Sequence, residues 1–177
     1  MQYVVLLRAV NVGGNPLRME RLREMCAGLG LKNVRTYLQS GNVVADARSD
    51  QWAGELEEKL TKVTRLAGCV IVRPAEAWAR VAAENPFLAE PGMVTGRLYV
   101  TFLAGKPTRE GLAKLGQVQA GTGRCKVVGT EVFLHCPDGY GSTKLSNLAV
   151  EKALGLRATT RNWNTVMNLL EMVRKAE

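Results

Sequence analysis

The chain has 177 residues and a net charge of +8, with 46% hydrophobic and 23% charged residues, as in a globular protein that buries a core. It has no apolar run near the ~20 residues that span a bilayer. Its opening residues lack the basic leader of a signal peptide, so we expect a cytoplasmic protein without a membrane segment. One histidine and four scattered cysteines exclude a multi-histidine metal site and argue against structural zinc, and no cofactor is expected.

Hydrophobic periodicity and turn residues in the first half predict a strand, a helix, a hairpin, a helix, a strand and a helix. Asn15 and Pro16 are typical of a helix start, and Gly30 of a helix end. The tripeptide at 39–41 is typical of a hairpin turn. The expected ranges are strands at 3–8, 34–38, 42–45 and 69–73, and helices at 16–29, 51–66 and 74–83.

The same order of elements recurs in the second half of the chain. The expected ranges are strands at 97–103, 124–128, 131–135 and 156–159, and helices at 108–115, 145–154 and 162–175. Each half therefore follows the βαββαβ pattern with an added C-terminal helix. We predict an α+β fold made by tandem duplication of a ferredoxin-like (alpha-beta plait) domain, with halves at 1–90 and 91–177.

The positive charge is concentrated in the second of these halves. Residues 1–90 contain 12 Lys/Arg and 10 Asp/Glu, a net charge of +2, whereas residues 91–177 contain 12 and 6, a net charge of +6. A basic half favours an anionic partner, such as a phosphate-bearing small molecule or nucleic acid.

Three motifs, spread over nearly the whole chain, carry a family resemblance. The first two are LLRAVNVGG at 6–14 and TYLQSGNVV at 36–44. The third is discontinuous and consists of the pairs at 144–145, 151–152, 154–155 and 158–159, followed by RNWNT at 161–165. On these motifs the chain resembles a bacterial family catalogued as domain of unknown function 1697. The resemblance implies two ferredoxin-like halves and no particular activity. The chain departs from the family pattern at Ala9, where Gly is usual, and at Ser142, where Arg commonly precedes the Ser/Thr-Lys pair.

Candidate binding residues in the first half cluster at two loops. Glycines between a strand and a helix can form a concave group of N–H donors for an anion, although a tight turn with an Asn cap explains them as well. Tyr37 and Gln39 point to one face by strand alternation. The candidates are Arg8, Asn11, Gly13, Gly14, Tyr37 and Gln39.

Candidate residues in the second half lie at two expected helix starts. Ser142 or Thr143 is expected to cap one helix, which places Lys144 in its first turn, where a cation opposes the helix dipole. An anion above Lys144 or simple solvation would both account for this lysine. At the second start, Asn162 is expected to cap the helix and Trp163 to enter the core. The candidates are Lys144, Glu151, Arg161, Asn162 and Asn164.

These residues support three hypotheses. The first is binding of an anionic ligand, a phosphate-bearing small molecule or nucleic-acid backbone, at helix N-termini. The second is an enzyme of unknown reaction that uses a cleft between the two halves. Nothing in the sequence requires an enzyme. The single histidine, His135, falls in an expected strand, where a structural role is favoured. In the third, the motifs only dock the halves on each other. The sequence predicts neither a catalytic residue nor an oligomeric state.

Overall fold

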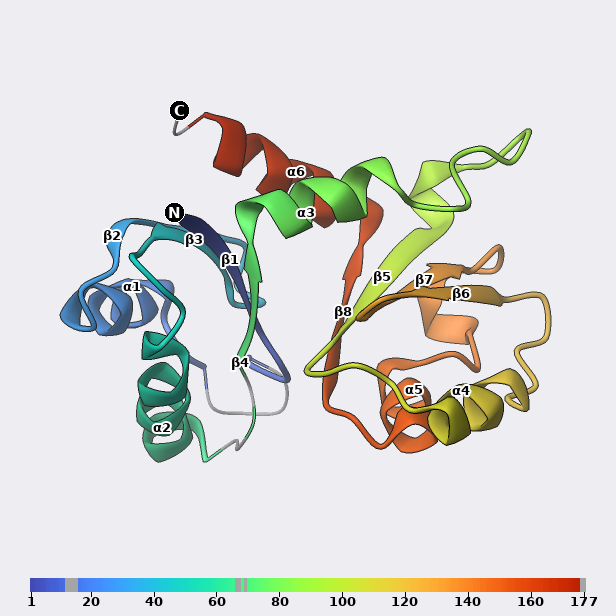
Figure 1. The fold of residues 1–177 in the computed structure, drawn as a ribbon, viewed down its shortest axis with the longest axis horizontal. Helices are drawn as coiled ribbons and strands as arrows, with labels where there is room; N and C mark the ends of the chain where they lie inside the picture. Colours follow the sequence, from blue (N-terminus) through green and yellow to red (C-terminus); the bar gives the residue numbers. More distant parts are fainter. Residues whose placement is uncertain (12–15, 66–67, 69, 176–177) are drawn as a thin grey trace. The chain divides into compact units, whose positions relative to one another are not determined.

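The computed structural model describes residues 1–11, 16–65, 68 and 70–175. The chain forms two compact units, one of residues 1–80 with 168–177 and the other of residues 81–167. We call them unit 1 and unit 2 and describe each by itself (Figure 1). Gly13 and Gly14, two of the candidate residues, lie outside the described residues.

Unit 1 is built on a four-stranded antiparallel sheet in the order β2-β3-β1-β4. One face of this sheet packs on α1 and α2, because Val43 of the sheet, Leu22 of α1 and Leu56 of α2 belong to one cluster of buried side chains. The elements are β1 (Gln2–Leu7), α1 (Met19–Gly28), β2 (Lys32–Tyr37), β3 (Asn42–Asp46), α2 (Trp52–Thr64), β4 (Val70–Pro74) and α3 (Ala75–Ala83), the last of which runs on into unit 2.

Unit 2 repeats this arrangement with a four-stranded antiparallel sheet in the order β6-β7-β5-β8. Leu103, Leu134 and Leu154 belong to the core between this sheet and its helices. The elements are η1 (Thr95–Arg97), β5 (Leu98–Leu103), α4 (Arg109–Gly116), β6 (Arg124–Val128), β7 (Glu131–His135), η2 (Tyr140–Ser142), α5 (Asn147–Leu154), β8 (Ala158–Asn162) and α6 (Trp163–Arg174), which continues into unit 1.

The described residues thus form a mixed α+β fold with two four-stranded antiparallel sheets and six α-helices. The order strand, helix, hairpin, helix, strand, helix occurs twice, which confirms the prediction of two similar halves. Among the described residues, no helix combines the length and the apolar character that crossing a membrane requires.

Several predicted boundaries were wrong, and three of them lie near candidate residues. The first helix begins at Met19 rather than at Pro16, with Arg18 at the N-cap. Ser146 caps α5, with its side chain accepting from the Ala149 N–H, so Lys144 precedes the helix and does not lie in its first turn. The last strand extends to Asn162, three residues beyond the expected end, because residues 158–162 pair in register with β5.

In unit 2, the segment before β5 is anchored by a buried aromatic ring. Phe87 is fully buried, with Lys126 Nζ at 4.7 Å and the Arg124 guanidinium carbon at 5.2 Å from its ring centroid. Arg124 Nη2 lies 3.2 Å from Nδ1 of His135. Because a guanidinium can only donate, Nδ1 accepts and the proton of neutral His135 lies on Nε2. His135 is therefore part of this anchor.

Glu90 completes the anchor and makes it sensitive to pH. Its carboxylate accepts from Arg124 at 2.6 Å and from Lys126 at 3.0 Å, and these hydrogen bonds lower the pKa of Glu90 from 4.5 to about 2. A carboxylate with a lowered pKa stabilises the fold above its unfolded-state pKa, and this contribution disappears as the pH falls toward the folded-state pKa. We therefore expect the thermal midpoint of Glu90→Gln to fall below that of the wild type at pH 7, and the two to converge near pH 2.

The effect should be small, since the carboxylate is accessible to solvent and to salt. Glu84→Gln is a matched control because it leaves the bonds of Arg124 and Lys126 to Glu90 intact. A gap between wild type and Glu90→Gln that stays constant from pH 7 to pH 2 would contradict the assignment.

Candidate functional site

Arg161 lies on one face of β8 and makes two hydrogen bonds within its own strand. Its Nη1 donates to Thr159 Oγ1 at 2.7 Å and to the Thr160 carbonyl at 2.9 Å, and burial lowers the pKa of the guanidinium to about 10. Arg73 in β4 likewise donates to the carbonyl of its preceding residue, Val72, at 3.0 Å. The two arginines also pair with corresponding strands, Arg73 with Val4 of β1 and Arg161 with Val100 of β5. The fourth strand of each sheet thus carries an arginine at the same position with the same hydrogen bond to the backbone, which indicates a shared structural role.

Asn162 and Asn164 lie together at the start of α6. Asn162 Oδ1 accepts from the Thr165 N–H at 2.8 Å, so Asn162 caps the helix as the sequence indicated, and Trp163 is buried. Both asparagines line a pocket of about 500 Å³, which has no lysine or arginine in its wall. Side chains alternate between the faces of a strand, so Asn162 points away from the face that carries Arg161. The strand therefore turns Arg161 and Asn162 to opposite faces.

Lys144 lines a different cavity, which we call the loop pocket. Its volume is about 270 Å³, and it lies between the loop before β6 and the loop that follows β7. The two loops pack closely, since a Cβ added at Gly123 would lie 3.1 Å from Thr143 Oγ1. The residues that line the loop pocket are Ala120, Gly121, Thr122, Gly123, Cys136, Asp138, Gly139, Ser142, Thr143 and Lys144.

Charged and hydroxyl groups give the loop pocket its chemistry. Thr122 Oγ1 donates to Asp138 Oδ2 at 2.5 Å, which ties that carboxylate to the pocket wall. Arg97 lies close to Gly139, because its Nη1 would be 3.3 Å from a Cβ added there. Two cations, Lys144 and Arg97, thus lie beside the same glycine-containing loop.

A partly buried polar network holds this loop on the sheet. The Tyr140 hydroxyl accepts from the Asn147 N–H at 2.8 Å, Thr160 Oγ1 donates to Asn147 Oδ1 at 3.0 Å, and Thr101 and Thr160 hydroxyls lie 2.7 Å apart. Burial raises the pKa of Tyr140. Glu151 has a similar role, because its Oε1 accepts from the Ala158 N–H at 2.7 Å and joins α5 to β8.

In unit 1, Asn11 joins the loop after β1 to the hairpin turn. Its Oδ1 accepts from the Leu17 N–H at 2.6 Å, and its Nδ2 donates to the carbonyls of Leu17 and Gln39. Ala9, Asn11 and Leu38 all have φ near +60°, a region that side-chain-bearing residues rarely adopt. The backbone of this pair of loops is therefore locally strained.

The other two predicted residues of unit 1 flank these loops. Arg8 directly follows β1, and Tyr37 ends β2; both side chains are half-buried. The structure thus brings the loops of Asn11 and Gln39 together, with Arg8 and Tyr37 at the adjoining strand ends.

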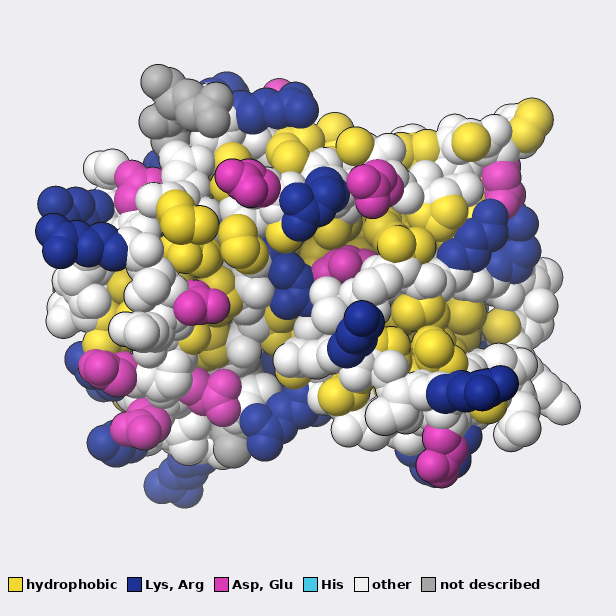
Figure 2. Space-filling model, viewed as in Figure 1, with side chains coloured by type: hydrophobic (Ala, Val, Ile, Leu, Met, Phe, Trp, Pro, Cys, Tyr) yellow, Lys and Arg dark blue, Asp and Glu magenta, His cyan; other side chains and the backbone are white. Residues whose placement is uncertain are grey.

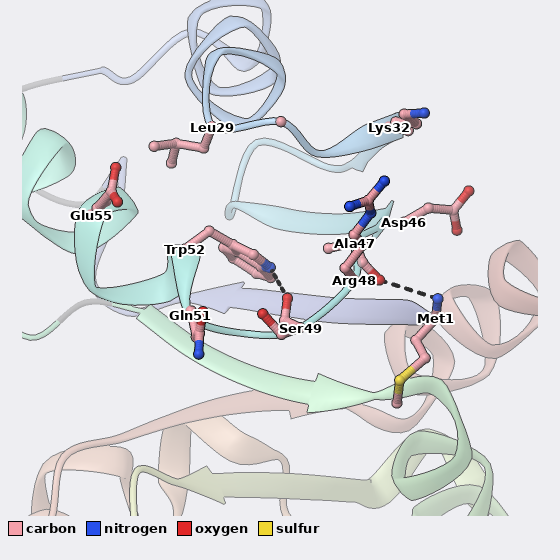
Figure 3. Close-up of a pocket in the computed structure, with 11 residues that line it drawn as sticks. Met1, Leu29, Lys32, Asp46, Ala47, Arg48, Ser49, Gln51, Trp52 and Glu55 are labelled. Carbon is pink, nitrogen blue, oxygen red and sulfur yellow. Dashed lines mark hydrogen bonds between the residues drawn. The ribbon is translucent and has the colours of Figure 1, made fainter.

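A larger pocket at unit 1 involves none of the predicted residues (Figure 3). Its volume is about 620 Å³, and we call it the Trp52 pocket. The sequence did not indicate this pocket, because the side chains that line it are single charged or apolar residues that form no recognisable motif. The pocket is lined by Met1, Leu29, Gly30, Lys32, Asp46, Ala47, Arg48, Ser49, Gln51, Trp52 and Glu55.

The charge asymmetry between the sequence halves disappears when charges are counted by unit. Unit 1 contains 14 Lys/Arg and 10 Asp/Glu, and unit 2 contains 10 and 6, so each has a net charge of +4. On the face shown in Figure 2, Lys and Arg side chains are interspersed with Asp and Glu and form no single basic patch. In the part of the chain that the structure describes, no three His, Cys, Asp or Glu side chains are grouped to hold a metal ion.

Comparison with known proteins assigns the family. Residues 1–133 match the family described as Protein of unknown function (DUF1697). The chain belongs to this family. The DUF1697 match includes the loops of Asn11 and Gln39 and ends before Lys144, so the third sequence motif lies beyond the matched residues.

A solved structure supports the same fold for this DUF1697 chain. The conserved bacterial protein SP0830 from Streptococcus pneumoniae is 21% identical, with a TM-score of 0.77 and 98% coverage of both chains. At this identity the similarity shows the fold alone. The comparison with curated proteins found no match.

Proposed function

We propose that the protein binds a small molecule through a phosphate or carboxylate group held in the loop pocket. The position of Lys144 carries the proposal, because it places an exposed ammonium group with three N–H donors in the wall of a cavity. The hydroxyl of Ser142 in the same wall adds a donor, and Arg97 beside Gly139 adds a second cation, so the cations outnumber the Asp138 carboxylate, which is held by Thr122. Charge-assisted hydrogen bonds of this kind are the strong ones in anion recognition.

The size of the loop pocket favours an anionic group over a larger ligand body. Its volume of about 270 Å³ lies just below the range of ~300–1,000 Å³ that is typical of pockets for whole small molecules. A nucleic-acid backbone is less well supported, because such partners bind to extended basic surfaces, often with aromatic stacking. The mixed charges on the face in Figure 2 argue in the same direction.

Titration with inorganic phosphate, followed by amide NMR shifts of residues 120–123 and 138–144, tests this site. We expect Lys144→Ala to weaken phosphate binding about tenfold, the effect of losing one charge-assisted hydrogen bond. Lys144→Arg should retain binding. The matched control is Lys152→Ala, at an exposed position of α5, which should bind phosphate as the wild type does.

Absence of shifts in these two loops, or equal binding by Lys144→Ala and wild type, would refute the loop pocket as an anion site. A parallel titration uses a single-stranded DNA oligonucleotide at several salt concentrations. If DNA binding is strongly salt-dependent and is unchanged in Lys144→Ala, the small-molecule proposal would be replaced by recognition of the nucleic-acid backbone by dispersed cations.

A structural role is the second candidate for most of the other polar residues. It is supported by the hydrogen bonds of Asn11, Glu151, Arg161 and Asn162 to backbone or side chains of their own unit. Docking of the two halves and an enzyme with a cleft between them both stay predictions, as does a cytoplasmic location.

For the fold itself, we propose the ferredoxin-like duplication predicted from the sequence. The strand orders β2-β3-β1-β4 and β6-β7-β5-β8 correspond strand by strand, and both sheets are antiparallel throughout. The halves at 1–90 and 91–177 remain predicted boundaries, whereas the compact units change over near residues 80 and 167.

A further inference from the structure

The Trp52 pocket differs from the loop pocket in both size and lining. Its volume of about 620 Å³ lies well inside the range of ~300–1,000 Å³ for pockets that hold whole small molecules. Its apolar wall is formed by Leu29, Ala47 and Trp52. Trp52 Nε1 donates to the Ser49 carbonyl at 2.6 Å, which fixes the indole ring in place (Figure 3).

Charged residues lie at two separate ends of this pocket. Figure 3 shows Glu55 on α2, on the same side as Leu29, and Lys32, Arg48 and Asp46 at the opposite side of Trp52. Asp46 Oδ2 accepts from Asn33 Nδ2 at 2.6 Å, so this carboxylate already has a partner within the sheet. The two cations outnumber this carboxylate, so their end of the pocket is net positive, whereas Glu55 makes the other end acidic, with apolar surface between them.

We propose that the Trp52 pocket binds a small zwitterion with an apolar body, of the short-peptide type. The ligand carboxylate would face Lys32 and Arg48, its ammonium group would face Glu55, and its apolar side chains would cover Leu29 and Trp52. A simple anion would leave Glu55 without a counterpart and facing a like charge, whereas a zwitterion satisfies both ends. The proposal concerns unit 1 and does not depend on the loop pocket.

The test uses the dipeptide leucyl-phenylalanine, its N-acetyl form and its C-terminal amide, each titrated by NMR against the full chain. We expect the dipeptide to shift amides around the pocket at 29–32 and 46–55, and each blocked form to bind about two- to fivefold more weakly, as for loss of one exposed ion pair. Glu55→Gln should remove the preference over the N-acetyl form only. Arg48→Gln should reduce the preference over the amide only.

Matched controls are Glu58→Gln, on the same helix but outside the pocket lining, and Arg21→Gln on α1. Both should retain the preference for the zwitterion. Equal binding of all three peptides, shifts outside the pocket, or no binding at all would overturn the proposal. Lys144→Ala should leave dipeptide binding unchanged, so failure here and failure of the loop pocket are separate results.

Discussion

Phe87→Ala is expected to destabilise the protein by about 3–5 kcal/mol, the usual cost of emptying a buried aromatic site. Phe87 is fully buried in unit 2, and its ring contacts the cations of Arg124 and Lys126 as well as the ring of His135 at a centroid distance of 6.0 Å. The substitution removes apolar burial and both cation–π contacts, each worth about 0.5–1 kcal/mol. Because whole domains are stable by only ~5–15 kcal/mol, urea unfolding should show a large drop in midpoint.

The neighbouring residue provides the control for this prediction. Leu88 is 40% exposed, so Leu88→Ala should change the free energy of unfolding far less. The anchor described for the segment before β5 would be wrong if the two variants unfolded at the same urea concentration. A urea midpoint for Phe87→Ala that equals the wild-type midpoint within error would likewise contradict the anchor.

Gly41→Ala is expected to cost about 2–5 kcal/mol, for two separable reasons. Gly41 has φ +75°, a left-handed conformation that costs a side-chain-bearing residue about 1–2 kcal/mol. An added Cβ would also lie 2.7 Å from the Cβ of Leu7, which is buried. The Leu7 N–H donates to the Gly41 carbonyl at 2.8 Å, so the two backbones cannot separate without losing that bond. Overpacking of this kind typically costs a further 1–3 kcal/mol.

Gly30→Ala isolates the first of these two costs. Gly30 has φ +83°, yet an added Cβ there would meet nothing within 4 Å. We therefore expect Gly30→Ala to lose only the 1–2 kcal/mol of backbone strain, and thermal unfolding should rank wild type above Gly30→Ala and both above Gly41→Ala. Equal losses for the two glycine variants would show that the contact with Leu7 relaxes at no cost.

The sequence by itself determined the order of elements and several local roles. Hydrophobic periodicity depends on near neighbours, so the strands and helices of both halves could be predicted from it. Asn162 as a helix cap is likewise local, because its hydrogen bond is made within one turn of α6, and the burial of Trp163 follows the helical spacing of its apolar neighbours. The family motifs indicated the DUF1697 family, to which the chain belongs.

Only the tertiary structure decided which polar residues share a site. The sequence placed Arg161 beside Asn162 at a helix start, but pairing with β5 extends β8 through both residues and turns them to opposite faces. Lys144 instead joins residues 120–123 from another loop, and Lys32, Arg48 and Glu55 meet around Trp52 from separate elements. Strand register and loop packing are long-range properties, and for that reason the stretch from 139 to 165 separates into a loop pocket, a helix cap and a half-buried arginine.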